Sequence, residues 1–164
     1  MVARILEILA KTYPDARCEL HFTSPLELLV ATILSAQCTD ARVNLVTPHL
    51  FKKYRSAKAY AEADPAVFEQ EIRTTGFFRS KARNIIACCQ ILVRDFGGKV
   101  PRTMEELTTL PGVGRKTANI ILYNAYGFPG FAVDTHVARV TNRLGLVNTE
   151  DPDKIKEQMC QVLP

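Results

Sequence analysis

The chain has 164 residues, 47% of them apolar, so it can form one compact domain or two small lobes that share a core. Lysine and arginine number 21 against 17 aspartates and glutamates, and the formal charge of +4 permits a nucleic-acid partner without requiring one. No apolar run approaches the roughly 18 residues of a membrane-spanning helix, so we expect no membrane partner.

Five cysteines occur, at Cys18, Cys38, Cys88, Cys89 and Cys160, without any Cys-x-x-Cys spacing. An odd and scattered set does not favour a disulfide framework, so we expect a reducing, intracellular setting. That setting would be the cytoplasm or nucleoid, or the nucleus in a eukaryote. The opening run MVARILEILAKTY is not a signal peptide in this interpretation, because Glu7 interrupts its apolar stretch.

Apolar periodicity and capping signals predict helices along the whole chain. Ser24 and Pro25 form a strong start signal, which Glu27 completes as a capping box. No strand alternation occurs, so the predicted fold class is all-α. In chain order, the expected helices cover residues 2–13, 25–34, 40–54, a short stretch before Asp64-Pro65, a helix opening there, 80–96, 103–110, 115–126, 135–144 and 152 to the chain end.

Residues 103–126 predict a helix, a tight glycine turn and a second helix. Gly112 and Gly114 immediately precede the second helix, and glycine permits positive φ and close approach of another backbone. The amide groups of Gly112, Val113, Gly114 and Arg115, with the helix dipole, suit a phosphate. The simpler alternative is a turn between packed helices. A proline and two glycines between two well-formed helices favour a helix-hairpin-helix site for the DNA backbone.

Lys116 lies just inside the second helix. Most lysines are simply solvated, and that is the alternative here. The helix dipole and the neighbouring Arg115 both disfavour a cation at this position, which favours the neutral amine that a nucleophile requires.

Asp134 precedes the helix predicted at 135–144, where the simple interpretation is an N-cap. The intervening helix is roughly 16 Å long, and the seven-residue loop 127–133 can extend to about 23 Å. The chain can therefore return Asp134 to Lys116, and capping and catalysis are compatible at one position.

Several motifs resemble the endonuclease III family of helix-hairpin-helix (HhH-GPD) DNA glycosylases. They are LPGVGRKTAN at 110–119 and VDTH at 133–136, with SPLELL at 24–29, LSAQCTD at 34–40 and GFFRSKA at 76–82. Their order is that of the family, and together they span essentially the whole chain. The resemblance implies one glycosylase domain over 1–164, built of short helices in two lobes with the active-site cleft between them. The central lobe would cover about 18–130, with the helix-hairpin-helix at 103–126, and the second lobe 1–17 and 131–164.

The resemblance also implies a reaction and roles for residues. Lys116 matches the nucleophile that attacks the sugar C1′, displaces the base and forms a Schiff base before β-elimination. Asp134 matches the acidic residue that assists it. The expected activity is a bifunctional glycosylase and AP lyase that removes damaged, oxidised pyrimidines from duplex DNA, acting as a monomer.

Further residues are expected to contact DNA. Gln37 matches the residue that fills the space of the flipped nucleotide, and Phe77 matches an apolar wedge position. Without the resemblance, Gln37 is a polar residue at a helix end and Phe77 a half-buried aromatic. Arg79 and Lys81, like the nearby Arg83, are candidate phosphate contacts, although a solvated face is the ordinary alternative for each.

The sequence departs from the family in one respect. Endonuclease III usually carries four C-terminal cysteines that hold a [4Fe–4S] cluster, and the five cysteines here do not match that spacing. We expect no metal and no cofactor in this chain, with a cluster possible only if the natural protein continues past Pro164. In the family, the C-terminal segment with these cysteines would pack near the chain ends. Without it, we expect exposed apolar surface on residues 2–13 and 152–163.

Two alternatives remain open from the sequence. A non-catalytic helix-hairpin-helix DNA-binding module needs Gly112 and Gly114 but has no use for Lys116 with Asp134. A monofunctional mismatch or adenine glycosylase would remove a base without cutting the strand, and Lys116 argues against it.

Overall fold

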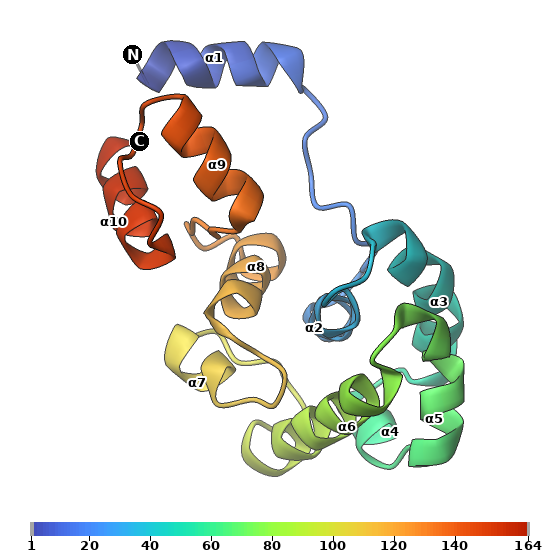
Figure 1. The fold of residues 1–164 in the computed structure, drawn as a ribbon. Helices are drawn as coiled ribbons and strands as arrows, with labels where there is room; N and C mark the ends of the chain where they lie inside the picture. The colour runs from blue at the N-terminus through green and yellow to red at the C-terminus, as the bar shows by residue number, and fades with distance from the viewer. Residues whose placement is uncertain (1, 164) are drawn as a thin grey trace. The chain divides into compact units, whose positions relative to one another are not determined.

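A computed structural model describes residues 2–163, and within this range it contains α-helices and one short 3-10 helix but no strand. The all-α prediction is confirmed. The chain divides into two units (Figure 1): unit 1 combines Met1–Arg17 with Pro129–Pro164, and unit 2 is Cys18–Phe128. None of the helices in the described range is long and apolar enough to cross a lipid bilayer.

Unit 2 carries most of the helices and the larger core. Its elements are α2 (Pro25–Leu34), α3 (Asp40–Lys53), α4 (Ala57–Ala61), α5 (Pro65–Glu71), η1 (Arg73–Thr75), α6 (Phe78–Asp95), α7 (Met104–Thr108) and α8 (Arg115–Tyr126). The helix predicted at 80–96 begins two residues earlier, at Phe78, and the short η1 was not expected from the sequence.

Helix α2 lies at the centre of unit 2. All residues from Leu28 to Leu34 are buried, and the helix contacts α3, α6 and α8. A helix that is apolar on every side is stable only when it is surrounded, and each fully buried leucine contributes roughly 1.5–3 kcal/mol. Figure 1 shows α2 almost end-on, with α8 and α3 on either side of it.

The start of α2 confirms Ser24 as the N-cap but modifies the predicted capping box. Ser24 Oγ accepts a hydrogen bond from the Glu27 amide at 3.2 Å. The Glu27 carboxylate instead accepts from the amide and hydroxyl of Thr23, at 2.6 and 2.8 Å. In a capping box the Glu27 carboxylate would accept from the Ser24 amide. Here it accepts from Thr23, one residue earlier.

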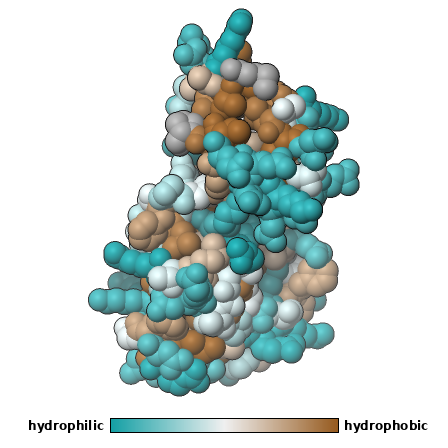
Figure 2. Space-filling model, turned by 90° about the vertical axis from the view of Figure 1, so that its left-hand side faces the viewer, coloured by the Kyte–Doolittle hydropathy of each residue, from teal (hydrophilic) through white to brown (hydrophobic). Residues whose placement is uncertain are grey.

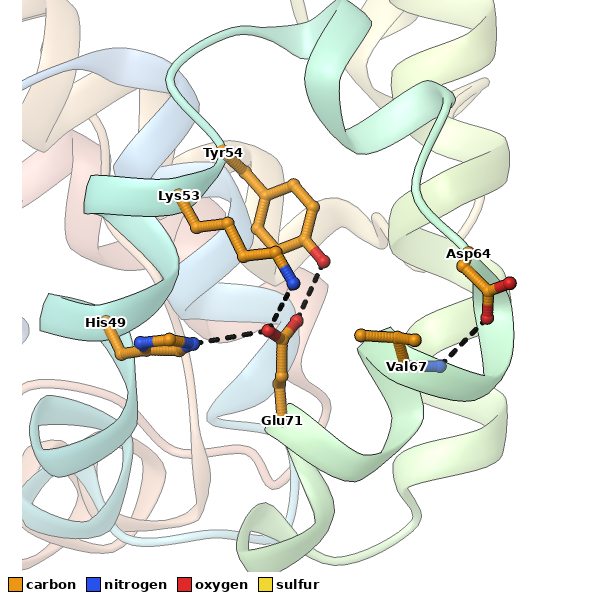
Figure 3. A network of polar contacts seen from close by, with 6 residues as sticks. All are labelled: His49, Lys53, Tyr54, Asp64, Val67 and Glu71. Atoms are coloured by element: carbon orange, nitrogen blue, oxygen red, sulfur yellow. Dashed lines mark hydrogen bonds and ion pairs between the residues drawn. The ribbon is translucent and has the colours of Figure 1, made fainter.

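A polar network joins α3 to α5 at the periphery of unit 2 (Figure 3). The Glu71 carboxylate accepts hydrogen bonds from Lys53 Nζ at 2.6 Å and Tyr54 Oη at 2.7 Å, and it lies 3.2 Å from His49 Nε2. Burial raises the pKa of Glu71, but the hydrogen bonds from Lys53, Tyr54 and His49 outweigh it, so the pKa is lowered. The ionised Glu71 carboxylate of α5 thus binds two side chains of α3, His49 and Lys53, and the side chain of the α3 C-cap, Tyr54.

Unit 1 consists of α1 (Val2–Thr12), α9 (Thr135–Arg143) and α10 (Pro152–Val162). Its small core contains Val147, Ile155 and Met159. The α1 helix buries none of its residues, although it is strongly amphipathic. A groove of about 390 Å³ runs between apolar side chains of all three helices, including Ile5, Val140 and Met159.

The expected exposure of apolar surface is confirmed for α1, where Ile8 is 54% and Leu9 is 41% exposed. In α10 it holds for Val162 only, since Ile155 and Met159 face the core of unit 1. Hydrophobic side chains gather in the upper part of Figure 2, where unit 1 lies.

Candidate functional site

The predicted helix-hairpin-helix is formed by α7, the turn 109–114 and α8. Val113 is buried and its amide donates to the Leu110 carbonyl at 3.1 Å, which closes the turn. Gly112 has φ of 78°, in the region that glycine favours. Gly114 has φ of −90° and serves as the N-cap of α8, so positive φ is not the reason for a glycine at this position.

Gly112 lies against Asn84 of α6. A Cβ added to Gly112 would come within 3.1 Å of the Asn84 Cβ, whereas a Cβ on Gly114 would meet open space. Asn84 was not expected from the sequence. The one indication in the sequence is its spacing. Asn84 is a polar residue three positions after Lys81, so the two side chains lie on neighbouring turns of the same helix face.

Lys116 is the second residue of α8 and is exposed, as is Arg115 before it. Ala118 and Ile121 bury the opposite side of the helix against the core of unit 2. The helix is therefore anchored by its apolar face, and its first turn presents two cationic side chains beside the glycine turn.

Asp134 belongs to unit 1 and is the N-cap of α9, as the sequence predicted. One carboxylate oxygen, Oδ1, accepts hydrogen bonds from the amides of His136 and Val137, at 3.0 and 2.8 Å. These two bonds fix the carboxylate to the start of α9.

Gln37 and Phe77 share an uncommon backbone conformation. With φ of 51° and 47°, they are the non-glycine residues of positive φ in the range 2–163. Both side chains line a hollow of about 250 Å³ in unit 2, together with Ser80, Asn84 and Gly112. Left-handed backbone in larger residues costs of order 1–3 kcal/mol and is concentrated at functional sites. Phe77 is 66% exposed, so it is not the half-buried aromatic of the alternative interpretation.

The structure corrects the prediction for Lys81. Its side chain is 4% exposed, and Nζ donates to the carbonyl oxygens of Leu34 and Thr75, each at 2.8 Å. Burial lowers the pKa of Lys81, while Cys38 acts in the opposite direction. A buried ammonium bonded to two carbonyls is not available to a phosphate. Its spacing to Ile85, four residues on and also buried, was the signal that could have revealed this.

Arg79 and Arg83, the other two cations of this segment, are exposed. The Arg79 guanidinium lies 5.4 Å from the centroid of the Phe78 ring. Both side chains can reach solvent from the first turns of α6, so contact with DNA phosphates stays a prediction for them.

The cysteines do not fit a [4Fe–4S] cluster. Within residues 2–163, no three His, Cys, Asp or Glu side chains are grouped so that they could hold a metal ion. Cys88 and Cys89 are buried in α6, and burial raises the pKa of Cys88 to about 12. Cys160 is exposed on α10, in the other unit.

Known proteins resemble this chain in sequence and in fold. Residues 30–164 match the model of the HhH-GPD superfamily of base excision DNA repair proteins. An endonuclease III of Synechocystis sp. is 53% identical over 161 residues, which are 98% of this chain and 74% of that protein.

Two solved structures are similar to this chain over 99% of its length and 77% of theirs, at 47% identity. One is a non-covalent endonuclease III–DNA complex, with a TM-score of 0.94. The other is a trapped endonuclease III–DNA covalent intermediate, with a TM-score of 0.93. The chain therefore belongs to the HhH-GPD superfamily of base excision DNA repair proteins, within its endonuclease III family.

Proposed function

We propose that this chain is a base-excision DNA glycosylase with AP-lyase activity, in which Lys116 is the nucleophile and Asp134 its carboxylate partner. One observation carries the proposal: an exposed lysine stands in the first turn of α8, directly after a glycine turn suited to the DNA backbone, in a chain of the endonuclease III family. A related protein has been trapped as a covalent intermediate with DNA.

The proposed excision and strand cleavage begin at the amine of Lys116. The neutral Lys116 nitrogen attacks C1′ of the deoxyribose, and the C1′–N bond breaks with its electron pair leaving on the base, which is protonated. Loss of a proton from the nitrogen and opening of the sugar yield a Schiff base. Removal of a C2′ proton then expels the 3′ phosphate, which cuts the strand.

Asp134 would accept the proton that the amine loses and stabilise the positive charge that develops on the sugar. Its bonds to the His136 and Val137 amides support this role, because a carboxylate fixed at a helix start needs little reordering during the reaction.

DNA binding would combine backbone and base-stack contacts. The amides of Gly112, Val113, Gly114 and Arg115 would bind a phosphate, and Arg79 would bind another. Gln37 would fill the space of the flipped nucleotide, and Phe77 would separate the neighbouring bases. The hollow that Gln37 and Phe77 both line supports this pairing of roles.

The partner we propose is duplex DNA that contains an oxidised pyrimidine or an abasic site, bound by a monomer in an intracellular compartment. We further propose that none of the five cysteines ligates a cluster, which their distribution over α6, two loops and α10 supports. Iron and acid-labile sulfide measured in the purified chain would test this directly.

Borohydride trapping tests the proposed function. The chain is incubated with duplex DNA containing an oxidised pyrimidine, and borohydride is added to reduce any Schiff base. We expect a covalent adduct with the unaltered protein and with Lys99→Gln, a control for loss of an exposed lysine in unit 2. We expect none with Lys116→Gln.

The other outcomes separate the alternatives. Duplex binding without any adduct in the unaltered protein would indicate a binding module. Base release without strand cleavage would indicate a monofunctional glycosylase. An adduct that persists in Lys116→Gln would remove Lys116 from the reaction, and peptide mapping would then identify the amine that replaces it.

A further inference from the structure

Lys81 joins the two turns that carry Gln37 and Phe77. Leu34, whose carbonyl accepts one Nζ bond, is the last residue of α2 and precedes Gln37 by three positions. Thr75, whose carbonyl accepts the other, ends η1 two positions before Phe77. A single side chain therefore connects two turns that lie far apart in the sequence.

The chemistry of this connection favours a cation. Carbonyl groups in the last turn of a helix lack intrahelical donors, and the helix dipole there attracts positive charge. Leu34 offers such a carbonyl at the end of α2. Burying an ammonium is costly unless charge-assisted hydrogen bonds compensate it, and Lys81 obtains two bonds of 2.8 Å at 4% exposure. A side chain without a donor would leave both carbonyls without this partner.

The two turns also need support from their surroundings. Gln37 and Phe77 both adopt left-handed backbone, with φ of 51° and 47°. Such conformations persist only where neighbouring structure holds them. Phe77 precedes the first residue of α6, and the Lys81 amide donates to the Phe77 carbonyl at 3.0 Å. Lys81 thus contacts one turn through both its amide and its ammonium.

We propose that Lys81 is a positioning residue, whose ammonium sets the spacing of the Gln37 and Phe77 turns so that both side chains enter the duplex together. The inference rests on the proposed glycosylase function and adds to it a residue that does not touch DNA. Asn84, one turn further along α6, lies close to Gly112. The first turns of α6 therefore adjoin the turns of Gln37, Phe77 and Gly112.

The test compares duplex with single-stranded substrate. Filling the vacated space and separating stacked bases matter only in a duplex, whereas Schiff-base formation by Lys116 needs neither. Lys81→Met, whose unbranched side chain is one atom shorter and has no donor, should slow processing of an abasic site in duplex DNA by about ten- to a hundredfold. Trapping on a single-stranded abasic oligonucleotide should change by less than about twofold, a bound we set from the absence of stacked neighbours.

A double-mutant cycle distinguishes positioning from a general loss of stability. Gln37→Ala should slow the duplex reaction strongly in the unaltered protein and only slightly in the Lys81→Met background. Leu92→Ala, which removes a buried side chain at the far end of α6, is the matched control. It should lower the melting temperature and leave the effect of Gln37→Ala unchanged.

Equal losses on duplex and single-stranded substrate, or additive effects of Lys81→Met and Gln37→Ala, would overturn the inference while leaving the glycosylase function intact. Absence of any adduct in the unaltered protein would instead reject the proposed function. If Lys81→Met does not fold, the same cycle is measured with Lys81→Arg, whose bulkier cation alters the spacing of the turns. The inference again requires a smaller effect of Gln37→Ala in the Lys81→Arg background than in the unaltered protein, and additive effects reject it.

Discussion

Gly112 and Asn84 are packed so closely that a Cβ on the glycine would lie 3.1 Å from the Asn84 Cβ. The contact joins the glycine turn of the helix-hairpin-helix to α6, which also carries Lys81. Because Gly112 has φ of 78° as well, both the backbone and the neighbouring side chain require glycine at this position.

We therefore predict that Gly112→Ala lowers the free energy of unfolding by about 1–3 kcal/mol and weakens binding to any duplex, whatever its sequence. Gly114→Ser is the matched variant, because Gly114 has φ of −90° and nothing within 4 Å of an added Cβ. Serine is a better N-cap than glycine, so the stability of Gly114→Ser should be unchanged or higher. Chemical denaturation and fluorescence anisotropy with undamaged duplex measure the two effects. Full affinity in Gly112→Ala would reject the backbone-binding turn.

Asp134 offers a way to separate capping from catalysis. Asp134→Asn keeps an oxygen that can accept from the His136 and Val137 amides, so the melting temperature should hardly change. Base release should slow by about 10²–10⁴-fold, the usual contribution of a catalytic carboxylate. Asp134→Ala should show the same kinetic loss and also lose about 1 kcal/mol of stability. Unchanged single-turnover rates in Asp134→Asn would remove Asp134 from the mechanism.

Phe77 should show opposite effects on stability and function. Its left-handed backbone is disfavoured by its Cβ, and its ring is 66% exposed, so little packing is lost on removal. We predict that Phe77→Gly raises the free energy of unfolding by up to about 1 kcal/mol while slowing excision from duplex DNA. Phe77→Leu should retain most excision, because it keeps an apolar wedge. A loss of stability in Phe77→Gly would show that the ring contributes more to the fold than to DNA binding.

The Glu71 network should make the stability of unit 2 depend on pH. The folded pKa of Glu71 lies below the ordinary glutamate value of 4.5, so its contribution is fully present above that value and is lost as the pH falls through the folded pKa. Glu71→Gln should therefore be less stable than the unaltered protein at pH 7, with the difference shrinking below about pH 4.5. Thermal melts between pH 3 and 7 measure this.

Glu69→Gln on the same helix is the control, since it removes a carboxylate outside the network of His49, Lys53 and Tyr54. A difference between Glu71→Gln and the unaltered protein that stayed constant over this pH range would contradict the assignment of the lowered pKa.

Local sequence signals predicted the helices well. Ser24, Asp64 and Asp134 each cap the helix whose start they predicted, and Asp151 caps the last helix. Capping, proline at the first turn and apolar periodicity depend on residues within one or two turns of each other, so they can be recognised in the sequence. The 3-10 helix η1 escaped notice because so short an element has no periodicity.

The sequence by itself determined the helical class, the glycine turn before α8, and the presence of a lysine and a capping aspartate in a family-like order. Only the tertiary structure decided which cations are available to DNA. Lys81 and Arg79 are two residues apart on α6 and have the same formal charge, yet one is buried between Leu34 and Thr75 and the other is exposed. The difference arises because the partners of Lys81 come from distant turns, and burial by distant segments leaves no local pattern in the chain.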